Sequence, residues 1–365
     1  MKFLRLAFYV LIAQLVLSGC AGEAVEETSS SSSSEINFDA YVGRNASTRS
    51  SITDIDFLKR DIKNPGNFNA GFGVFARYNY NGKILSLLDT EHVTWNKDQN
   101  HWEYTNTRFW PSEGSVDFYA FAPYSAQPKL DNFEIDFPSN WSPVDLVYAN
   151  AEGKTKTDNP VKFTFKHALA RLGFDITANP KIEEKDVVIK VKEVRLYGAS
   201  ETSGIFLMAG HLNLQTGNWR PYDNKTSWFY TWTPTGKVEG KENVENGKED
   251  ENSIIYKLSV PPQLDHEHDK VTNHDDSYIF IIPQKKPDFF NLKITYTVEQ
   301  GKFKEEDVTV TKNLLDVLPG DSNPYFKGGK AYVFHFKLSL DPVNFDVKTT
   351  VGNWIGNEVK DEITI

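Results

Sequence analysis

The sequence predicts an all-β fold, because strand-like alternation and turn residues recur along nearly the whole chain. Apolar and polar residues alternate with a period of two over 36–42, 290–298 and 332–340, as in strands with one buried face. Two denser apolar segments, 116–122 and 278–282, predict strands buried on both faces. Gly, Pro and Asn separate these segments, a pattern typical of sandwiches and barrels.

The predicted strands divide into two domains. About 330 residues follow the N-terminal segments, which is enough for two domains of ordinary size. Residues 150–160 are polar, charged and rich in turn formers, so they indicate a linker. We therefore expect an N-terminal β-sandwich over 36–157 and a C-terminal β-sandwich over 158–365. Only residues 166–172, with the sequence KHALARL, favour a helical turn.

The N-terminus predicts export and lipidation. Lys2 and Arg5 provide a short basic start, residues 4–17 form the hydrophobic stretch, and Leu-Ser-Gly-Cys follows at its end, up to Cys20, the chain's single cysteine. This tetrapeptide looks like a bacterial lipobox, in which the cysteine thiol is acylated and the chain is cut before it. We expect a signal peptide over 1–20 and a lipid anchor at Cys20. The alternative is a plain signal peptide followed by a structural cysteine.

Residues 21–35 predict a flexible tether. Three glutamates follow Cys20 closely, and residues 29–34 are consecutive serines, which bury nothing. Acidic residues just behind a lipidated cysteine resemble the surface-export signal of Bacteroidetes lipoproteins. A solvated tether that simply carries charge is the alternative.

Charge and composition exclude several classes of function. The formal net charge of −10 and the pI near 5.4 argue against nucleic acid as a partner. A single cysteine allows no disulfide within the chain. No catalytic motif is present, and a polysaccharide-degrading enzyme would need a carboxylate pair that the sequence does not nominate. We therefore expect no enzymatic activity and no cofactor.

Two other patterns offer binding functions. His266, His268 and His274 lie among carboxylates and could ligate a divalent metal, although a hydrated loop has the same composition. The chain also has eight tryptophans, and exposed aromatic rings stack on sugars. Aromatic residues at strand periodicity are otherwise core residues. A monomeric surface lipoprotein that binds a glycan or a host protein is therefore the alternative function.

Several short motifs, in order along the chain, resemble the fimbrillins of Bacteroidetes. The resemblance rests on the lipobox at Cys20, the first strand from Ile36, and the closing segment Val351-Gly352-Asn353-Trp354. Between them come the segments 72–76, 110–123 and 165–172.

The resemblance implies two transthyretin-like β-sandwich domains in tandem, without enzymatic activity. It also implies a pilus subunit that is exported as a palmitoylated outer-membrane lipoprotein and cut after an arginine. Loss of the first strand then opens a groove that a strand of another fimbrial subunit fills. Strand addition of this kind joins backbones by hydrogen bonds and places alternate side chains in pockets.

Mapped onto this sequence, the resemblance nominates residues for each step. Cleavage falls between Arg49 and Ser50, with Arg44 as the less favoured position. The displaced first strand presents Ile36, Phe38, Ala40 and Val42 to the core. A donor strand lies within 343–365, where the apolar residues Val343, Phe345, Val347, Ile363 and Ile365 alternate. The alternative for this segment is an edge of the second sandwich.

Overall fold

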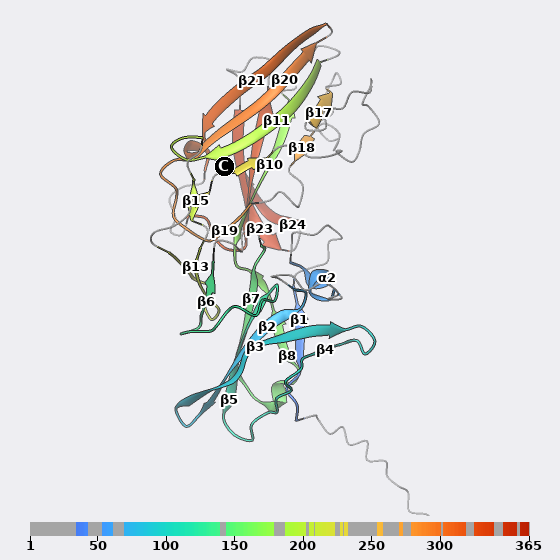
Figure 1. Cartoon of the computed structure of the whole chain (residues 1–365), viewed down its shortest axis with the longest axis vertical. Coiled ribbons are helices and arrows are strands. Elements are labelled where there is room, and N and C mark those ends of the chain that lie inside the picture. The colour runs from blue at the N-terminus through green and yellow to red at the C-terminus, as the bar shows by residue number, and fades with distance from the viewer. Residues whose placement is uncertain are drawn as a thin grey trace, which may run out of the picture.

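The computed structural model confirms the all-β prediction for the residues that it describes. These are 34–42, 53–60, 69–138, 144–178, 187–201, 204–207, 209–222, 227–228, 230–232, 254–257, 270–272, 279–300, 302–318, 325–338, 346–355 and 358–364. Within these ranges the helical elements are one α-helix, α2 (Ile55–Leu58), and two 3-10 helices, η3 (Lys156–Asp158) and η6 (Leu315–Val317). All other elements are strands. They form an elongated molecule with two units stacked along its long axis (Figure 1).

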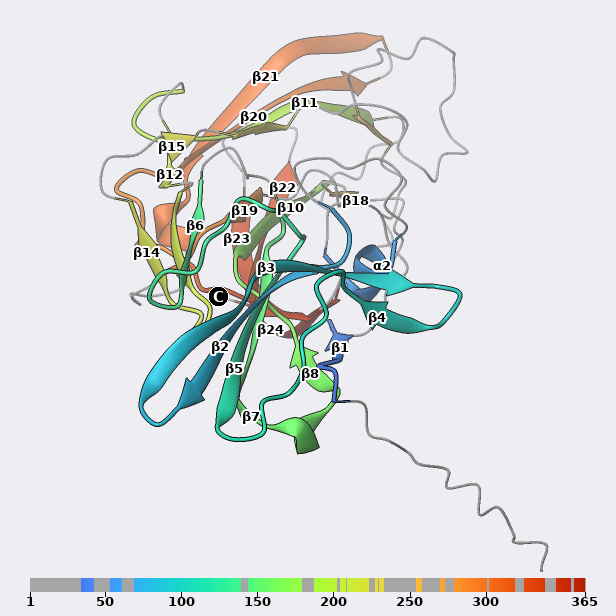
Figure 2. The same ribbon diagram turned by 60° about the horizontal axis from the view of Figure 1, so that its bottom comes forward.

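The first unit contains a six-stranded sheet in the order β4-β3-β2-β5-β7-β9, beside which β1 and β8 pair separately. Its strands are β1 (Phe38–Tyr41), β2 (Phe72–Tyr80), β3 (Lys83–Asn96), β4 (His101–Glu103), β5 (Ser115–Ala122), β7 (Val147–Lys154), β8 (Val161–Thr164) and β9 (Lys166–His167). The β2–β3 turn uses Asn81 and Gly82, both with positive φ, as an Asn-Gly hairpin requires. Figure 2 shows the β1–β8 pair beside the sheet that contains β5 and β7.

The second unit packs two larger sheets against each other. One has the order β18-β10-β22-β23-β24, with β19 also paired to β10; the other has the order β16-β11-β20-β21, with β17 paired to β11. The strands are β10 (Ala170–Ala178), β11 (Val187–Tyr197), β16 (Tyr230–Trp232), β17 (Ile254–Lys257), β18 (Lys270–Thr272), β19 (Ile279–Ile281), β20 (Asn291–Gln300), β21 (Phe303–Asn313), β22 (Lys330–Leu338), β23 (Asp346–Ile355) and β24 (Glu358–Thr364).

Two small sheets complete the described structure. Strands β14 (Trp219–Pro221), β13 (Gly210–Asn213) and β6 (Glu134–Phe137) form one, and β12 (Phe206–Leu207) pairs with β15 (Ser227–Trp228) in the other. Strand β6 comes from the first half of the chain and β13 from the second. This sheet therefore connects segments that are far apart in the sequence.

Three buried apolar cores follow from these sheets. One core fills the first unit, from β1, β2, β5 and β8, and another fills the second unit, from β10, β20 and β22. The third core, which we call the junction core, joins residues of both units: Phe75, Tyr119, Phe121, Ile135, Phe137, Leu146, Ala168, Leu169, Leu212, Leu214, Phe280, Ile282, Ala331 and Trp354.

Strands that are buried on both faces supply two of these cores at once. Along β5, Phe118 and Ala120 lie in the first-unit core, while Tyr119 and Phe121, which alternate with them, lie in the junction core. The dense apolar segment 116–122 is therefore buried on both faces, as the sequence predicts. The same holds at 280–282, where Ile281 faces the second-unit core and its two neighbours face the junction core.

Two local expectations differ from the structure. Residues 166–172 form β9 and the start of β10, with no helical turn, because both segments pair with strands of the surrounding sheets. Residues 150–154, expected in a linker, continue β7 and pair with β5. In addition, β8 pairs with β1 and its side chains lie in the first-unit core, although it follows the expected division between 157 and 158.

Candidate functional site

The first strand has an unusual position, because it belongs to none of the three large sheets. Strand β1 runs parallel to β8, with Phe38 opposite Val161 and Tyr41 opposite Thr164. The amides of Val161 and Phe165 donate to the carbonyls of Asn37 and Tyr41, each at 2.8 Å. Parallel pairs normally occur inside sheets covered on both faces, whereas this pair stands alone.

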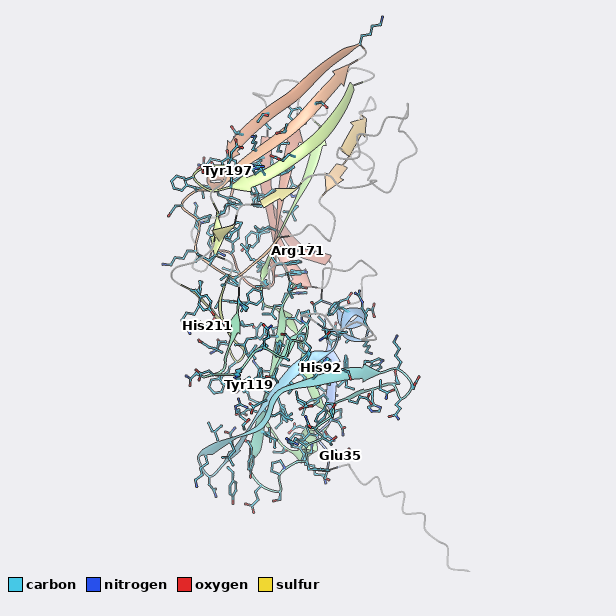
Figure 3. All side chains as sticks on the ribbon, in the orientation of Figure 1. Glu35, His92, Tyr119, Arg171, Tyr197 and His211 are labelled. Atoms are coloured by element: carbon cyan, nitrogen blue, oxygen red, sulfur yellow. The ribbon has the colours of Figure 1, made fainter. Side chains whose placement is uncertain are left out.

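The residues just before β1 are held by a second segment. The amide of Ile36 donates to the carbonyl of Arg108 at 2.8 Å, and the amide of Trp110 donates to the carbonyl of Ser34 at 2.7 Å. The hydroxyl of Tyr104 donates to the carbonyl of Ile36 at 2.9 Å. Glu35, labelled in Figure 3, marks where this stretch enters the first unit. The first strand therefore lies between two segments that are distant in sequence.

The apolar side chains of this segment point into the first-unit core. Ile36, Phe38 and Val42 are 0%, 4% and 2% exposed, and Ala40 is partly buried against the same core. The intervening Tyr41 is 52% exposed. Burying a side chain such as Ile or Phe contributes about 1.5–3 kcal/mol, so side-chain burial is a large part of what holds this strand.

Aromatic rings surround Phe38. Its ring centroid lies 5.3 Å from that of Tyr104, 5.7 Å from Phe163, 5.8 Å from Phe118 and 6.4 Å from Phe72. We call the surface formed by these four rings and covered by β1 the first-strand groove. If β1 left, the groove would present aromatic rings and unpaired amides to water. Both features favour refilling by another strand.

The chain re-enters the described structure beyond the expected cleavage position at a buried polar anchor. The Thr53 amide donates to Asp145 Oδ2 at 2.7 Å, and the Thr53 hydroxyl donates to the Asp145 carbonyl at 2.6 Å. Asp145 Oδ1 lies 3.0 Å from His167 Nδ1, in a pair whose side chains are almost fully buried. Asp54 then caps α2, and its burial raises the pKa of its carboxyl above the ordinary value. Segment 53–58 is thus fixed independently of β1.

The same anchor reaches the C-terminal strands through stacked rings. The His167 ring lies 3.8 Å from the Trp354 ring at an interplanar angle of 10°, and Phe280 stacks on Trp354 at 5.5 Å. The Arg171 guanidinium lies 5.3 Å from the Trp354 ring centroid. Figure 3 labels Arg171 at the level where the two units meet. This set of residues could not be predicted from the sequence, because no local pattern links residues so far apart.

The C-terminal strands are part of the second unit in this structure. Strand β23 pairs antiparallel with β22, and β24 pairs with β23 at the edge of the sheet. Val347 is 6% exposed and opposes Phe336, while Ile363 opposes Val351 in the β23–β24 ladder. The role of residues 343–365 as a donor strand stays a prediction. Val343, Phe345 and Ile365 lie outside the described residues.

Other expected site residues also lie outside the described residues. These are Cys20, Arg44, Arg49 and Ser50, and the metal candidates His266, His268 and His274. Within the described part of the chain, no group of three or more His, Cys, Asp or Glu side chains is placed to hold a metal. No helix among those residues is long and apolar enough to span a bilayer.

The tryptophans whose side chains are described are all at least partly buried. Trp102, Trp110 and Trp354 are 4%, 7% and 3% exposed. Trp95 lies against Trp102 with the Lys59 ammonium 3.7 Å from its ring centroid, and the Trp219 indole donates to the carbonyl of Ala168. These rings are used in packing, so none of them forms an open platform for a sugar.

Comparison with known proteins connects this architecture to one family. Residues 63–354 match the sequence model of a family described as Fimbrillin-like. A search of the curated proteins found no match.

Among solved structures, a fimbrial protein from Bacteroides vulgatus matches with a TM-score of 0.61 at 19% identity, covering 88% of this chain and 99% of that one. At this identity the match shows a shared fold. A candidate cell adhesion protein from Bacteroides uniformis matches with a TM-score of 0.45 at 16% identity, covering 88% and 98% of the two chains. The C-terminally truncated tip fimbrial protein Mfa3 from Porphyromonas gingivalis gives 0.35 at 8% identity, covering 78% and 93%.

Proposed function

The chain belongs to the fimbrillin-like family, and from that premise we propose that it is a structural subunit of a cell-surface fimbria, assembled with other fimbrial subunits by strand exchange. Proteins of this family are structural and adhesive, not enzymes. The fold shared with the Bacteroides vulgatus fimbrial protein supports the same conclusion. We also infer that the two units are transthyretin-like sandwich domains.

The observation that carries this proposal is the position of β1, paired only with β8 and outside the large sheets. A strand that belongs to none of the large sheets can leave without breaking the six-stranded sheet of the first unit. Its buried side chains at 36, 38 and 42 nevertheless leave apolar pockets behind. Strand β1 can therefore leave the first-strand groove, and the empty apolar pockets then favour binding of another strand.

Release of β1 requires a cut between β1 and the next fixed segment. Segment 53–58 stays anchored through Asp145 and the α2 cap after such a cut, because its hydrogen bonds do not involve β1. Arg49, followed by Ser50, lies between the two and is the proposed processing position, with Arg44 less favoured. Proteolysis there would release the strand and leave the rest of the first unit in place.

The mode of assembly follows from the different positions of the donor and acceptor surfaces on the chain. The groove lies on the first unit, and the proposed donor residues come from 343–365, at the second unit. Donor and acceptor surfaces differ, so the contact is head-to-tail and generates a filament. We propose that acylation of Cys20 delivers the precursor to the outer membrane before this step.

The test combines the mature N-terminus with assembly in vitro. Protein isolated from intact cells is expected to begin at Ser50, and purified precursor cleaved after Arg49 is expected to form oligomers seen by size-exclusion chromatography and electron microscopy. The Arg44→Ala/Arg49→Ala double variant is the matched control, which should resist cleavage and stay monomeric. Cleaved protein that has lost residues 36–49 and remains monomeric at high concentration would show that the proposal is wrong.

A further inference from the structure

The six-stranded sheet of the first unit is open along one short stretch of β3. Strand β3 pairs with β2 along most of its length, whereas on its other side β4 covers only residues 94–96. At the opposite end, residues 83–86 are all exposed, with Ile84 at 64% and Leu85 at 57%. Figure 2 shows the β2–β3 hairpin projecting at one side of the first unit. An exposed apolar edge of this kind is a surface on which a further strand can pair.

The turn of this hairpin determines which backbone groups point outward. Its two-residue Asn-Gly turn makes Tyr80 and Lys83 the first pair that exchanges hydrogen bonds across the hairpin. Because hydrogen-bonded and non-hydrogen-bonded pairs alternate, the backbone N–H and C=O groups of Ile84 and Ser86 point away from β2. On that side, no described strand pairs with residues 83–86.

The open edge ends at Leu87. Leu87 is the extra residue of a β-bulge, without a register partner in β2, and its carbonyl accepts from Arg108 Nε at 3.2 Å. Bulges and covering side chains are devices that protect sheet edges from pairing. The stretch before Leu87 has neither device among the described residues, and Lys83 at its end is its single charged residue.

Leu85 extends an apolar surface that begins at the first-unit core. It opposes Tyr78, which is partly buried against that core. Tyr80 stacks on Tyr78 with ring centroids 6.1 Å apart and an interplanar angle of 8°, and it is 40% exposed. The hydroxyls of Tyr78 and Tyr80 donate to the carbonyl and the carboxylate of Glu113, at 3.0 and 2.7 Å. Tyr78, Tyr80 and Leu85 thus form an ordered apolar strip beside the open edge.

We propose that the open edge of β3 pairs antiparallel with the same edge of a second copy of the chain, around a twofold axis at Leu85. In this register Ile84 of each copy opposes Ser86 of the other, so the outward N–H and C=O groups of both residues find partners. A shift that places Ile84 opposite Ile84 leaves Ser86 facing the turn. The opposite shift places Ile84 across from Leu88, whose carbonyl already accepts from Arg77.

The side chains also fit a second copy. At the axis the two Leu85 side chains form a non-hydrogen-bonded pair, in which facing side chains lie closest, and the two apolar strips meet there. Lys83 opposes Leu87 of the other copy, so like charges do not meet. An edge this short is expected to bind weakly as a single contact, and to become effective where many copies lie side by side. The contact is separate from strand exchange and goes beyond the proposed function.

The test traps the contact with a disulfide in intact, full-length protein carrying Cys20→Ser, so that an introduced cysteine is the single thiol. With Leu85→Cys, the two Cα atoms at the axis lie about 4.5 Å apart, within the range of a disulfide. Ile84→Cys is the matched control, because Ile84 is at least as exposed but lies diagonally, about 7–8 Å, from its counterpart. On non-reducing gels after mild oxidation, Leu85→Cys should form dimers at least about tenfold faster than Ile84→Cys.

The other outcomes overturn the proposal. Equal rates for the two variants would indicate random collision, and faster linking of Ile84→Cys would show that the register is wrong. If neither variant forms dimers, a second copy does not occupy the edge. Loss of binding to phosphatidylglycerol vesicles in Leu85→Asp would then assign the strip to a lipid surface. Because the protein is uncleaved throughout, a failure here leaves the proposed function standing.

Discussion

At the scale of single residues, the first unit contains a histidine whose protonation opposes folding. The His92 ring stacks on Tyr124 at 3.6 Å, and its Nε2–H donates to the carbonyl of Ala70 at 2.8 Å. Burial lowers the pKa of His92 below its ordinary value, which outweighs the favourable contacts with Ala70 and Glu91. The neutral imidazole is therefore the form that the fold accommodates.

This burial predicts a pH dependence of stability. Below about pH 6.5 the unfolded chain binds a proton at His92 more readily than the folded chain, so the free energy of unfolding falls as the pH decreases through that range. His92→Gln retains a donor for Ala70 and should reduce this loss between about pH 7.5 and 5.5. Urea unfolding of both proteins at the two pH values checks it. Parallel pH profiles for the two proteins would contradict the assignment.

At this scale, the burial of some side chains could be predicted from the sequence, whereas the long-range contacts of others could not. The inward positions of the first strand follow from alternation alone, and Ile36, Phe38 and Val42 are buried as the pattern indicates. The anchor of Asp145, His167 and Trp354 could not be predicted, because the pairing of β7 with β9 joins the first two and the meeting of the two units adds Trp354.

At the scale of elements, the two C-terminal strands differ in what they contribute to the fold. Strand β23 is internal to its sheet and supplies Val347 and Trp354 to two cores, whereas β24 is the edge strand. A deletion of 351–365, which would remove the whole closing segment, also removes Trp354 and so damages the junction core. A shorter deletion separates the two strands.

Deletion of residues 356–365 is expected to leave the second unit folded, because the buried contacts of β23 remain. The melting temperature should fall by a few degrees at most, as expected for the loss of an edge strand. If the donor strand is formed by Val343, Phe345 and Val347, without Ile363 and Ile365, the truncated and cleaved protein still polymerises, which electron microscopy can detect. The deletion 346–365 is the matched control and should unfold the second unit.

Elements that were mispredicted show why local propensity fails here. Residues 166–172 are rich in Ala, Leu, Lys and Arg, which are good helix formers. They form strands because His167 pairs with Val147 while Ala170 and Leu172 pair with β19, and these tertiary contacts outweigh the local preference. By contrast, β20 was predictable, because Leu292 and Ile294 are buried while Lys293 between them is more exposed.

At the scale of the whole molecule, the junction core makes the two units one body. Domains joined by small polar interfaces normally move relative to each other, and a large apolar interface prevents this. Here residues from both units share one core around Trp354. We therefore expect the intact protein to unfold in a single transition, with both units cooperating.

Trp354→Ala tests this coupling. Removing a buried tryptophan from a core costs about 3–5 kcal/mol, and here the loss falls on the contact between the units. Calorimetry is expected to show the single transition split in two, with the first at lower temperature. Phe289→Ala, at a ring that is 56% exposed, is the control and should leave the transition single. A variant that keeps one transition would show that the units are coupled elsewhere.

The parallel pairing of β1 with β8 has a mechanical consequence for any strand that replaces β1. Backbone hydrogen bonds from Val161 and Phe165 cross to the occupant of the groove, and its alternate side chains lie in successive pockets. Tension along the strand axis would load these contacts together in shear, whereas a force across the axis would peel them one at a time. A filament joined in this way resists pulling along its length far better than it resists lateral prying.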